Sequence, residues 1–178
     1  MRIISKILLL TAVMIVSLCI TCFAKLPSNQ TSLGGITLFQ PISDVLKVYG
    51  TPTYFDNSKI EYGTPTTVII GKTSEWTINE GSGGSKTPIV GIIRVTANNG
   101  FATPAGVTVG MDTAVLYKVY GHPDRLMNKK STPYNIPKRN DYDTLYIYYG
   151  PAGHNFAFFV RNEKIIEICL GLGIGALG

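Results

Sequence analysis

The chain has 178 residues, with 16 Lys and Arg, 11 Asp and Glu, and 45% hydrophobic residues, a balance typical of a folded domain and unlike that of a disordered segment. Its formal charge of +5 falls to +3 when Arg2 and Lys6 of an apolar leader are set aside (5 − 2 = 3), and no long basic run remains. This charge is too small and too scattered to indicate a nucleic-acid-binding protein.

The leader, residues 1–24, is typical of a secretory signal peptide. Arg2 and Lys6 form a positive start, Ile7–Ile20 is apolar, and small residues stand at the −3 and −1 positions before a cleavage site after Ala24. The apolar stretch would make only about 21 Å of helix, which is short of the ~30 Å core of a bilayer. We therefore expect cleavage and export to the periplasm, the cell envelope or the extracellular space.

The cysteines divide between the leader and the mature chain. Cys19 and Cys22 lie in the leader, and lipidation of either is an alternative to cleavage that the residues before them disfavour. Only Cys169 remains afterwards, so an intramolecular disulfide is excluded. Because Cys169 lies in an apolar run, we expect its thiol to be buried and inert.

An internal repeat sets the expected domain organisation. The segments 35–52 and 106–123 align at a constant offset of 71 with 7 of 18 positions identical, including Lys-Val-Tyr-Gly and a closing proline. We interpret them as two copies of one module, at about 31–103 and 104–178. Each module is near the size at which a lone core is marginal, so we expect the two to fold as one unit.

Each copy begins with a short amphipathic helix. Apolar residues recur at i, i+3, i+4 and i+7 in the first copy, and a matching stripe follows in the second. Gly50 and Gly121 are suited to ending these helices. The two stripes are Ile42, Val45, Leu46 and Tyr49, and Thr113, Leu116, Tyr117 and Tyr120.

Three strands are expected after each helix. β-branched and aromatic runs predict strands at 66–71, 75–79 and 89–96 in the first copy, and at 144–149, 155–160 and 164–170 in the second. Their connections are too short for parallel crossovers. The predicted fold class is therefore α+β: two tandem repeats, each a short helix followed by a three-stranded antiparallel meander, packed as one unit.

The second copy carries the motif by which the chain resembles a known family. Gly-Val-Thr-Val-Gly-Met-Asp at 106–112, followed by Val-Leu-Tyr-Lys-Val-Tyr-Gly-His-Pro-Asp at 115–124, resembles the module of the SmpA/OmlA (BamE-like) outer-membrane lipoproteins. A tandem pair also resembles the architecture of the β-lactamase inhibitor protein. The resemblance implies a non-enzymatic envelope protein that presents a surface to other proteins, or an inhibitor of a secreted enzyme. The first copy departs from the pattern at Phe39-Gln40-Pro41, where Gly and Met are expected.

Catalytic, metal and cofactor sites have little support in the sequence. His122 occupies a turn in which the first copy has Thr51, and His154 lies in a Gly- and Pro-rich turn. Neither has the local spacing of a zinc site or of a Cys/His/Asp set. We therefore predict a protein that is not an enzyme and holds no metal or cofactor. A small envelope hydrolase is the alternative, and it requires one histidine to meet an acid and a nucleophile in one cleft.

Two features are candidates for protein binding. Strand alternation places Tyr146 and Tyr148 on one face, with Phe156 and Phe158 following on the next strand, and tyrosine favours protein interfaces. The competing interpretation is that the tyrosines pack beneath the other module or a long loop at 128–143. That loop carries the second candidate, a basic and aromatic set that suits an acidic partner or a phosphate-rich surface: Lys129, Lys130, Tyr134, Lys138 and Arg139.

The sequence thus predicts an exported, non-catalytic interaction or scaffold module of the bacterial cell envelope. Its expected partner is another envelope or secreted protein, with peripheral contact to a membrane surface left open and no role for nucleic acid. A secreted enzyme inhibitor is the alternative among binding functions.

Overall fold

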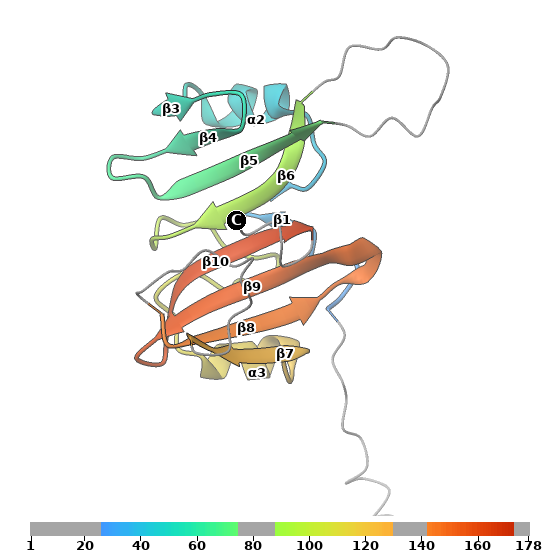
Figure 1. Ribbon diagram of the computed structural model, residues 1–178, viewed down its shortest axis with the longest axis vertical. Coiled ribbons are helices and arrows are strands. Elements are labelled where there is room, and N and C mark those ends of the chain that lie inside the picture. Colours follow the sequence, from blue (N-terminus) through green and yellow to red (C-terminus); the bar gives the residue numbers. More distant parts are fainter. Residues whose placement is uncertain (1–25, 75–87, 130–141, 173–178) are drawn as a thin grey trace, which may run out of the picture.

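The computed structural model describes residues 26–74, 88–129 and 142–172. Two short helices and a small hairpin accompany one large antiparallel sheet (Figure 1). The elements in chain order are β1 (Ser32–Leu33), β2 (Ile36–Thr37), α2 (Ile42–Tyr49), β3 (Tyr54–Phe55), β4 (Lys59–Tyr62), β5 (Val68–Ser74), β6 (Pro88–Val95), α3 (Ala114–Tyr120), β7 (Arg125–Asn128), β8 (Thr144–Tyr149), the 3₁₀ turn η2 (Pro151–Gly153), β9 (His154–Arg161) and β10 (Lys164–Leu172).

The large sheet has eight strands in the order β3-β4-β5-β6-β10-β9-β8-β7. Four strands follow α2 and four follow α3, and the last strand of each set, β6 and β10, are antiparallel neighbours at the centre. Register pairs such as Ile168 with Val95 and Leu170 with Ile93 join the two sets. The sheet is therefore continuous from one free edge, β3, to the other, β7 (Figure 1).

The predicted fold class is wrong. The chain is mostly β, and its described strands form one eight-stranded sheet with a separate two-stranded sheet, in place of two helix-plus-three-strand meanders. Physically, the short strands β3, β4 and β7 add to those expected, and pairing of β6 with β10 fuses the halves. The predicted strand at 75–79 lies outside the described residues.

The backbone around the two helices repeats at the offset seen in the sequence. Gly50 and Gly121 both have φ of 73°, and their N–H groups donate to the carbonyls of Leu46 and Tyr117. Phe39 also has positive φ, 68°, at the position where the second copy has Gly110 with φ of 94°. An L-residue is strained in this conformation, so Phe39 holds a place that favours glycine.

The buried apolar side chains form two clusters that pack against the large sheet. In the larger one, the buried helix residues Val45, Leu116 and Tyr120 pack with inward residues of both halves. The smaller cluster includes Leu145, Ile147, Ala157, Phe159 and Cys169, which alternate with members of the larger one along β8, β9 and β10. Both faces of β8, β9 and β10 therefore carry buried apolar side chains, and Cys169 is buried as predicted.

Buried polar groups tie the halves together at two places. Arg94 Nε of β6 lies 2.9 Å from Glu167 Oε1 of β10, and only 1% of the Glu167 side chain is exposed. The Tyr120 hydroxyl donates to Thr103 Oγ1 at 2.6 Å. Burial raises the pKa of Tyr120 from 10.0 to about 12. None of the helices within the described ranges has the length and apolar character needed to span a bilayer.

Candidate functional site

The four aromatic residues predicted as a binding face lie mainly in the interior. Tyr148, Phe156 and Phe158 are fully buried, and Tyr146 is partly buried against the larger cluster. The ring of Tyr120 in α3 lies 5.3 Å from that of Tyr148 and 5.7 Å from that of Phe158. Helix α3 of the same half thus covers them, whereas the competing interpretation named the other module or the loop. The rings of Tyr148, Phe156 and Phe158 therefore pack the core, and Tyr146 alone of the four keeps some exposed surface.

The basic loop is described only at its ends. Lys129 is exposed, and its backbone N–H donates to the carbonyl of Asp143 at 3.1 Å. Lys129 also lines a shallow hollow of about 330 Å³ with Asn128, Tyr142 and Asp143. The other predicted residues of this set lie outside the described residues: Lys130, Tyr134, Lys138 and Arg139.

The two histidines do not meet. His122 is exposed and its ring contacts that of Tyr117 at 5.5 Å, while His154 is buried at the start of β9. His154 Nε2 has no hydrogen-bond partner in the described part of the chain. Across residues 26–74, 88–129 and 142–172, no group of three His, Cys, Asp or Glu side chains is placed to hold a metal ion. The arrangement that a hydrolase requires is not assembled by these residues.

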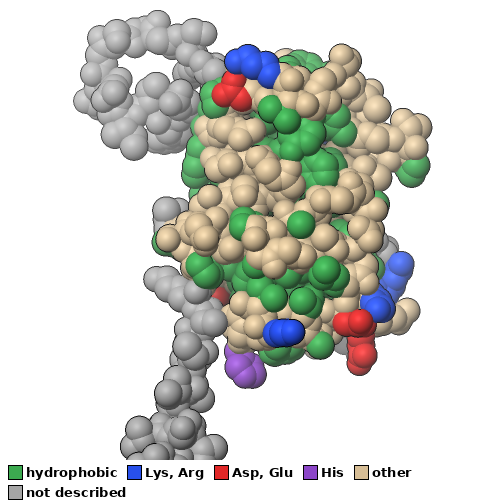
Figure 2. Space-filling view, turned by 180° about the vertical axis from the view of Figure 1, so that it is seen from behind, with side chains coloured by type: hydrophobic (Ala, Val, Ile, Leu, Met, Phe, Trp, Pro, Cys, Tyr) green, Lys and Arg blue, Asp and Glu red, His purple; other side chains and the backbone are tan. Residues whose placement is uncertain are grey.

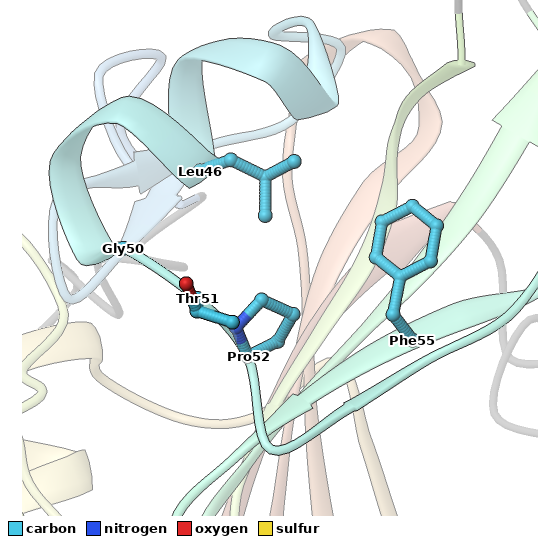
Figure 3. Close-up of a pocket in the computed structure, with 5 residues that line it drawn as sticks. All are labelled: Leu46, Gly50, Thr51, Pro52 and Phe55. Atoms are coloured by element: carbon cyan, nitrogen blue, oxygen red, sulfur yellow. The ribbon is translucent and has the colours of Figure 1, made fainter.

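An apolar surface hollow lies where the chain leaves α2 and enters β3. It has a volume of about 420 Å³ and is lined by Leu46, Gly50, Thr51, Pro52 and Phe55; we call it the α2–β3 hollow. In Figure 3 the Leu46 side chain lies above Thr51 and Pro52, and the Phe55 ring stands apart on the right. The Phe55 side chain is 55% exposed, which is unusual for a ring of this size.

The residues that follow α2 explain the shape of the hollow. Gly50 ends α2 in a left-handed conformation and Pro52 prevents the helix from continuing, so the chain turns sharply toward the sheet. Leu46 lies in the last turn of the helix and Phe55 lies on the outermost strand. A helix end and a sheet edge therefore stand apart with only the short segment 51–53 to fill the space between them.

The rim of the hollow is built on a tight hairpin between β3 and β4. Asp56 accepts hydrogen bonds from the backbone N–H groups of Ser58 (2.6 Å) and Lys59 (2.8 Å) and from the Tyr54 hydroxyl (2.9 Å). These donors hold the pKa of the Asp56 carboxyl well below its usual range. The hydrogen bond between the Tyr54 hydroxyl and Asp56 raises the pKa of Tyr54. The hairpin that carries Phe55 is consequently fixed by its own side chains.

Cations lie beside the exposed rings of β3. Lys72 Nζ lies 4.1 Å from the centroid of the Phe55 ring and donates to the main-chain oxygen of Asp56. Lys59 Nζ lies 5.2 Å from the Tyr54 ring and pairs with Glu61. Lys72 differs from Lys59, because no carboxylate of the described residues pairs with it. The hollow therefore has an apolar lining and a neighbouring positive charge.

The second half has aromatic rings at two of the corresponding positions. At the offset of 71, Leu46 corresponds to Tyr117 and Thr51 to His122, whose rings meet edge to face at 5.5 Å. Tyr117 also contacts the ring of Tyr146 at 6.0 Å. The first half has smaller side chains at these positions, and the α2–β3 hollow lies there. This contrast was present in the aligned repeats, but the sequence prediction assigned Leu46 to a core stripe and Phe55 to no element.

Further apolar side chains are exposed around α2. Val48, on the helix itself, is 75% exposed, and Phe39, before its start, is 49% exposed. In the view opposite to that of Figure 1, hydrophobic side chains are scattered from the upper to the lower part of the surface, while charged ones stand mostly near its edges (Figure 2). Val48 on α2 and Phe39 just before it thus add exposed apolar side chains to the helix whose end borders the hollow.

Comparison with known proteins gives one distant structural likeness. The chain is similar to the crystal structure of a DUF4309 family protein (YjgB) from Bacillus subtilis subsp. subtilis str. 168, with 16% sequence identity and a TM-score of 0.47, covering 84% of this chain and 88% of that chain. No protein-family model matches the sequence, and no curated protein matches it.

Proposed function

We propose that this chain is an exported, non-catalytic protein-binding module of the bacterial cell envelope, and that the α2–β3 hollow belongs to its binding surface. The observation that carries the proposal is the open apolar hollow beside the exposed Phe55 ring. Burying such a surface against a partner removes apolar area from water, at about 25 cal/mol per Å². The signal peptide predicted at residues 1–24 supports export.

Phe39 supports a role for the surface around α2. Its left-handed backbone costs free energy that glycine would avoid, and its side chain is half exposed, so packing does not explain its presence. A strained residue that packing does not explain is a pointer to function. The partner that fits is another envelope or secreted protein.

Site-specific photo-crosslinking tests this proposal. A photoreactive phenylalanine analogue replaces Phe55 in the native host, and the matched control replaces Leu126, the corresponding residue of the second half, which is 56% exposed against 55% for Phe55. We expect one envelope protein to crosslink from position 55 and not from position 126. The adduct should disappear when Leu46→Tyr fills the hollow.

Processing is measured in the same experiment. Intact-mass analysis of the exported protein should place its N-terminus after Ala24, at Lys25. Equal crosslinking from positions 55 and 126, or a protein retained unprocessed in the cytoplasm, would contradict the proposal.

A further inference from the structure

The second half of the chain indicates which kind of side chain the α2–β3 hollow binds. In the second half, the rings of Tyr117 and His122 stand at the positions of Leu46 and Thr51, and Tyr117 packs edge to face on Tyr146. The backbone is closely matched there, since Gly50 and Gly121 share a φ of 73° and similar ψ values of −156° and −151°. The same backbone therefore carries two aromatic rings in contact at these positions in the second half.

The positive charge of Lys72 beside the hollow favours an acidic residue in the bound segment. Lys47 pairs with Asp44 at 2.9 Å and Lys59 pairs with Glu61, so these charges are neutralised within the chain. Lys72 has a backbone oxygen and the Phe55 ring as its partners, and no carboxylate of the described residues. An acidic side chain next to the bound ring would complement this ammonium group.

The sheet edge favours an extended backbone. β3 is the outermost strand of the described sheet, and Asp56 N–H donates to Lys59 O at 3.0 Å, while Phe55 stands opposite Ile60. Because antiparallel pairing alternates, the N–H and C=O of Phe55 point to the open side. Side chains two residues apart on an extended chain lie on one side, about 7 Å from each other.

We propose that the α2–β3 hollow binds an aromatic side chain of an extended segment of a partner protein, with an acidic residue two positions away paired to Lys72. This inference rests on the proposed protein-binding function and names the chemistry of the partner. The aromatic ring packs between Leu46 and Phe55, and the partner backbone runs beside β3. Lys72 supplies the preference for acidic neighbours.

A peptide titration followed by amide NMR tests the proposal on the purified, processed protein. The probe is Gly-Ser-Asp-Ser-Phe-Ser-Asp-Ser-Gly, and the controls replace its Phe by Leu or both Asp by Lys. We expect shifts centred on Leu46, Thr51 and Phe55, with a Kd of about 0.1–1 mM. The Leu control should bind about fivefold more weakly, and the Lys control about threefold more weakly.

Two pairs of variants separate the ring site from the charge. Leu46→Tyr, which copies the second half, should weaken binding of the probe about tenfold, while the matched change Tyr117→Leu should leave it unaltered. Lys72→Gln should remove the difference between the Asp and Lys peptides, and Lys72→Arg should retain it. Thermal melts of each variant confirm that the fold persists.

The results of these experiments distinguish failure of the proposed occupant from failure of the proposed binding function. Shifts outside the hollow, equal binding of the Phe and Leu peptides, insensitivity to Leu46→Tyr, or no binding at millimolar peptide would each overturn the inference. If the peptides fail while the position-55 crosslink forms, the protein-binding function stands and only the aromatic and acidic occupant is wrong. If the crosslink fails as well, both proposals fall.

Discussion

Replacement of Gly71 by alanine probes the packing of Ile92 on β6, the strand that forms the joint between the two halves. Ile92 of β6 stands between two glycines, with Gly71 of β5 as its register partner on one side and Gly171 of β10 on the other. A Cβ added to Gly71 would lie 2.3 Å from Ile92 Cγ2, far inside van der Waals contact. A Cβ added to Gly171 would lie 3.1 Å from Ile92 Cγ1.

The geometry gives a sign and a magnitude for each substitution. Overpacking of this kind costs about 1–3 kcal/mol. Alanine restricts the unfolded chain and returns about 0.4–1 kcal/mol, so Gly71→Ala should lower the free energy of unfolding by roughly 1–2 kcal/mol. Gly171→Ala requires a shift of only a few tenths of an ångström, and its net effect should stay within about 0.5 kcal/mol.

Denaturant unfolding followed by far-UV circular dichroism measures these differences, with an unchanged m-value as the condition for comparison. A double-mutant cycle with Ile92→Ala isolates the clash, because that change removes the γ-carbons that Gly71→Ala meets. We expect a coupling of about 1 kcal/mol or more. Equal costs for the two glycine substitutions, or a coupling below about 0.3 kcal/mol, would refute the packing described for this joint.

Four other predictions follow from the described contacts. Tyr120→Phe should lower the free energy of unfolding by about 1–2 kcal/mol in urea titrations, because it removes the buried hydrogen bond to Thr103; an unchanged midpoint contradicts it. Burial raises the pKa of Tyr120 from 10.0 to about 12, so between these pH values the folded protein retains a proton that the unfolded chain releases. The free energy of unfolding should therefore fall as pH rises from about 10 to 12, by up to about 1.4 kcal/mol per pH unit. Tyr120→Phe should flatten this dependence on pH. Phe39→Gly should raise stability by about 0.5–1 kcal/mol, since relief of left-handed strain exceeds the added chain entropy; a lower melting temperature would show that the ring contributes packing. The fragment 104–178 should lack a cooperative calorimetric transition, because β10 loses its pairing with β6; a melt equal to that of the mature chain would show independent halves.

The helices and most of the longer strands were accessible from the sequence because they have strong local signals. The stripe of α2 and the glycine that ends it define an eight-residue helix at Ile42–Tyr49, within the region predicted. The strands β6, β8, β9 and β10 also fall where β-branched and aromatic runs place them. Local periodicity and turn residues suffice for such elements.

The overall topology was not accessible in the same way. β3 has two residues and β4 has four, with Lys59 and Glu61 among them, so neither shows a run that predicts a strand. The pairing of β6 with β10 joins residues more than 70 positions apart, and no local pattern encodes it. The number of strands and the continuity of the sheet consequently came out wrong.

The burial of the predicted aromatic face has a separate physical origin. Alternation correctly separates Tyr146 and Tyr148 from Leu145 and Ile147, but it does not say whether one face or both are covered. β9 carries the better signal, since residues 156–160 form an unbroken apolar run, and all of them are buried. Such a run indicates a strand that is buried on both faces.

The repeat is more informative for its differences than for its identities. Identical residues such as Gly50 and Gly121 maintain a shared backbone, and they therefore explain the fold without distinguishing one half from the other. Leu46 against Tyr117 and Thr51 against His122 alter the same surface position in opposite ways, one leaving space and the other placing two rings in contact. On the proposal made above, these substituted positions on a shared backbone are where the two copies differ in what they can bind.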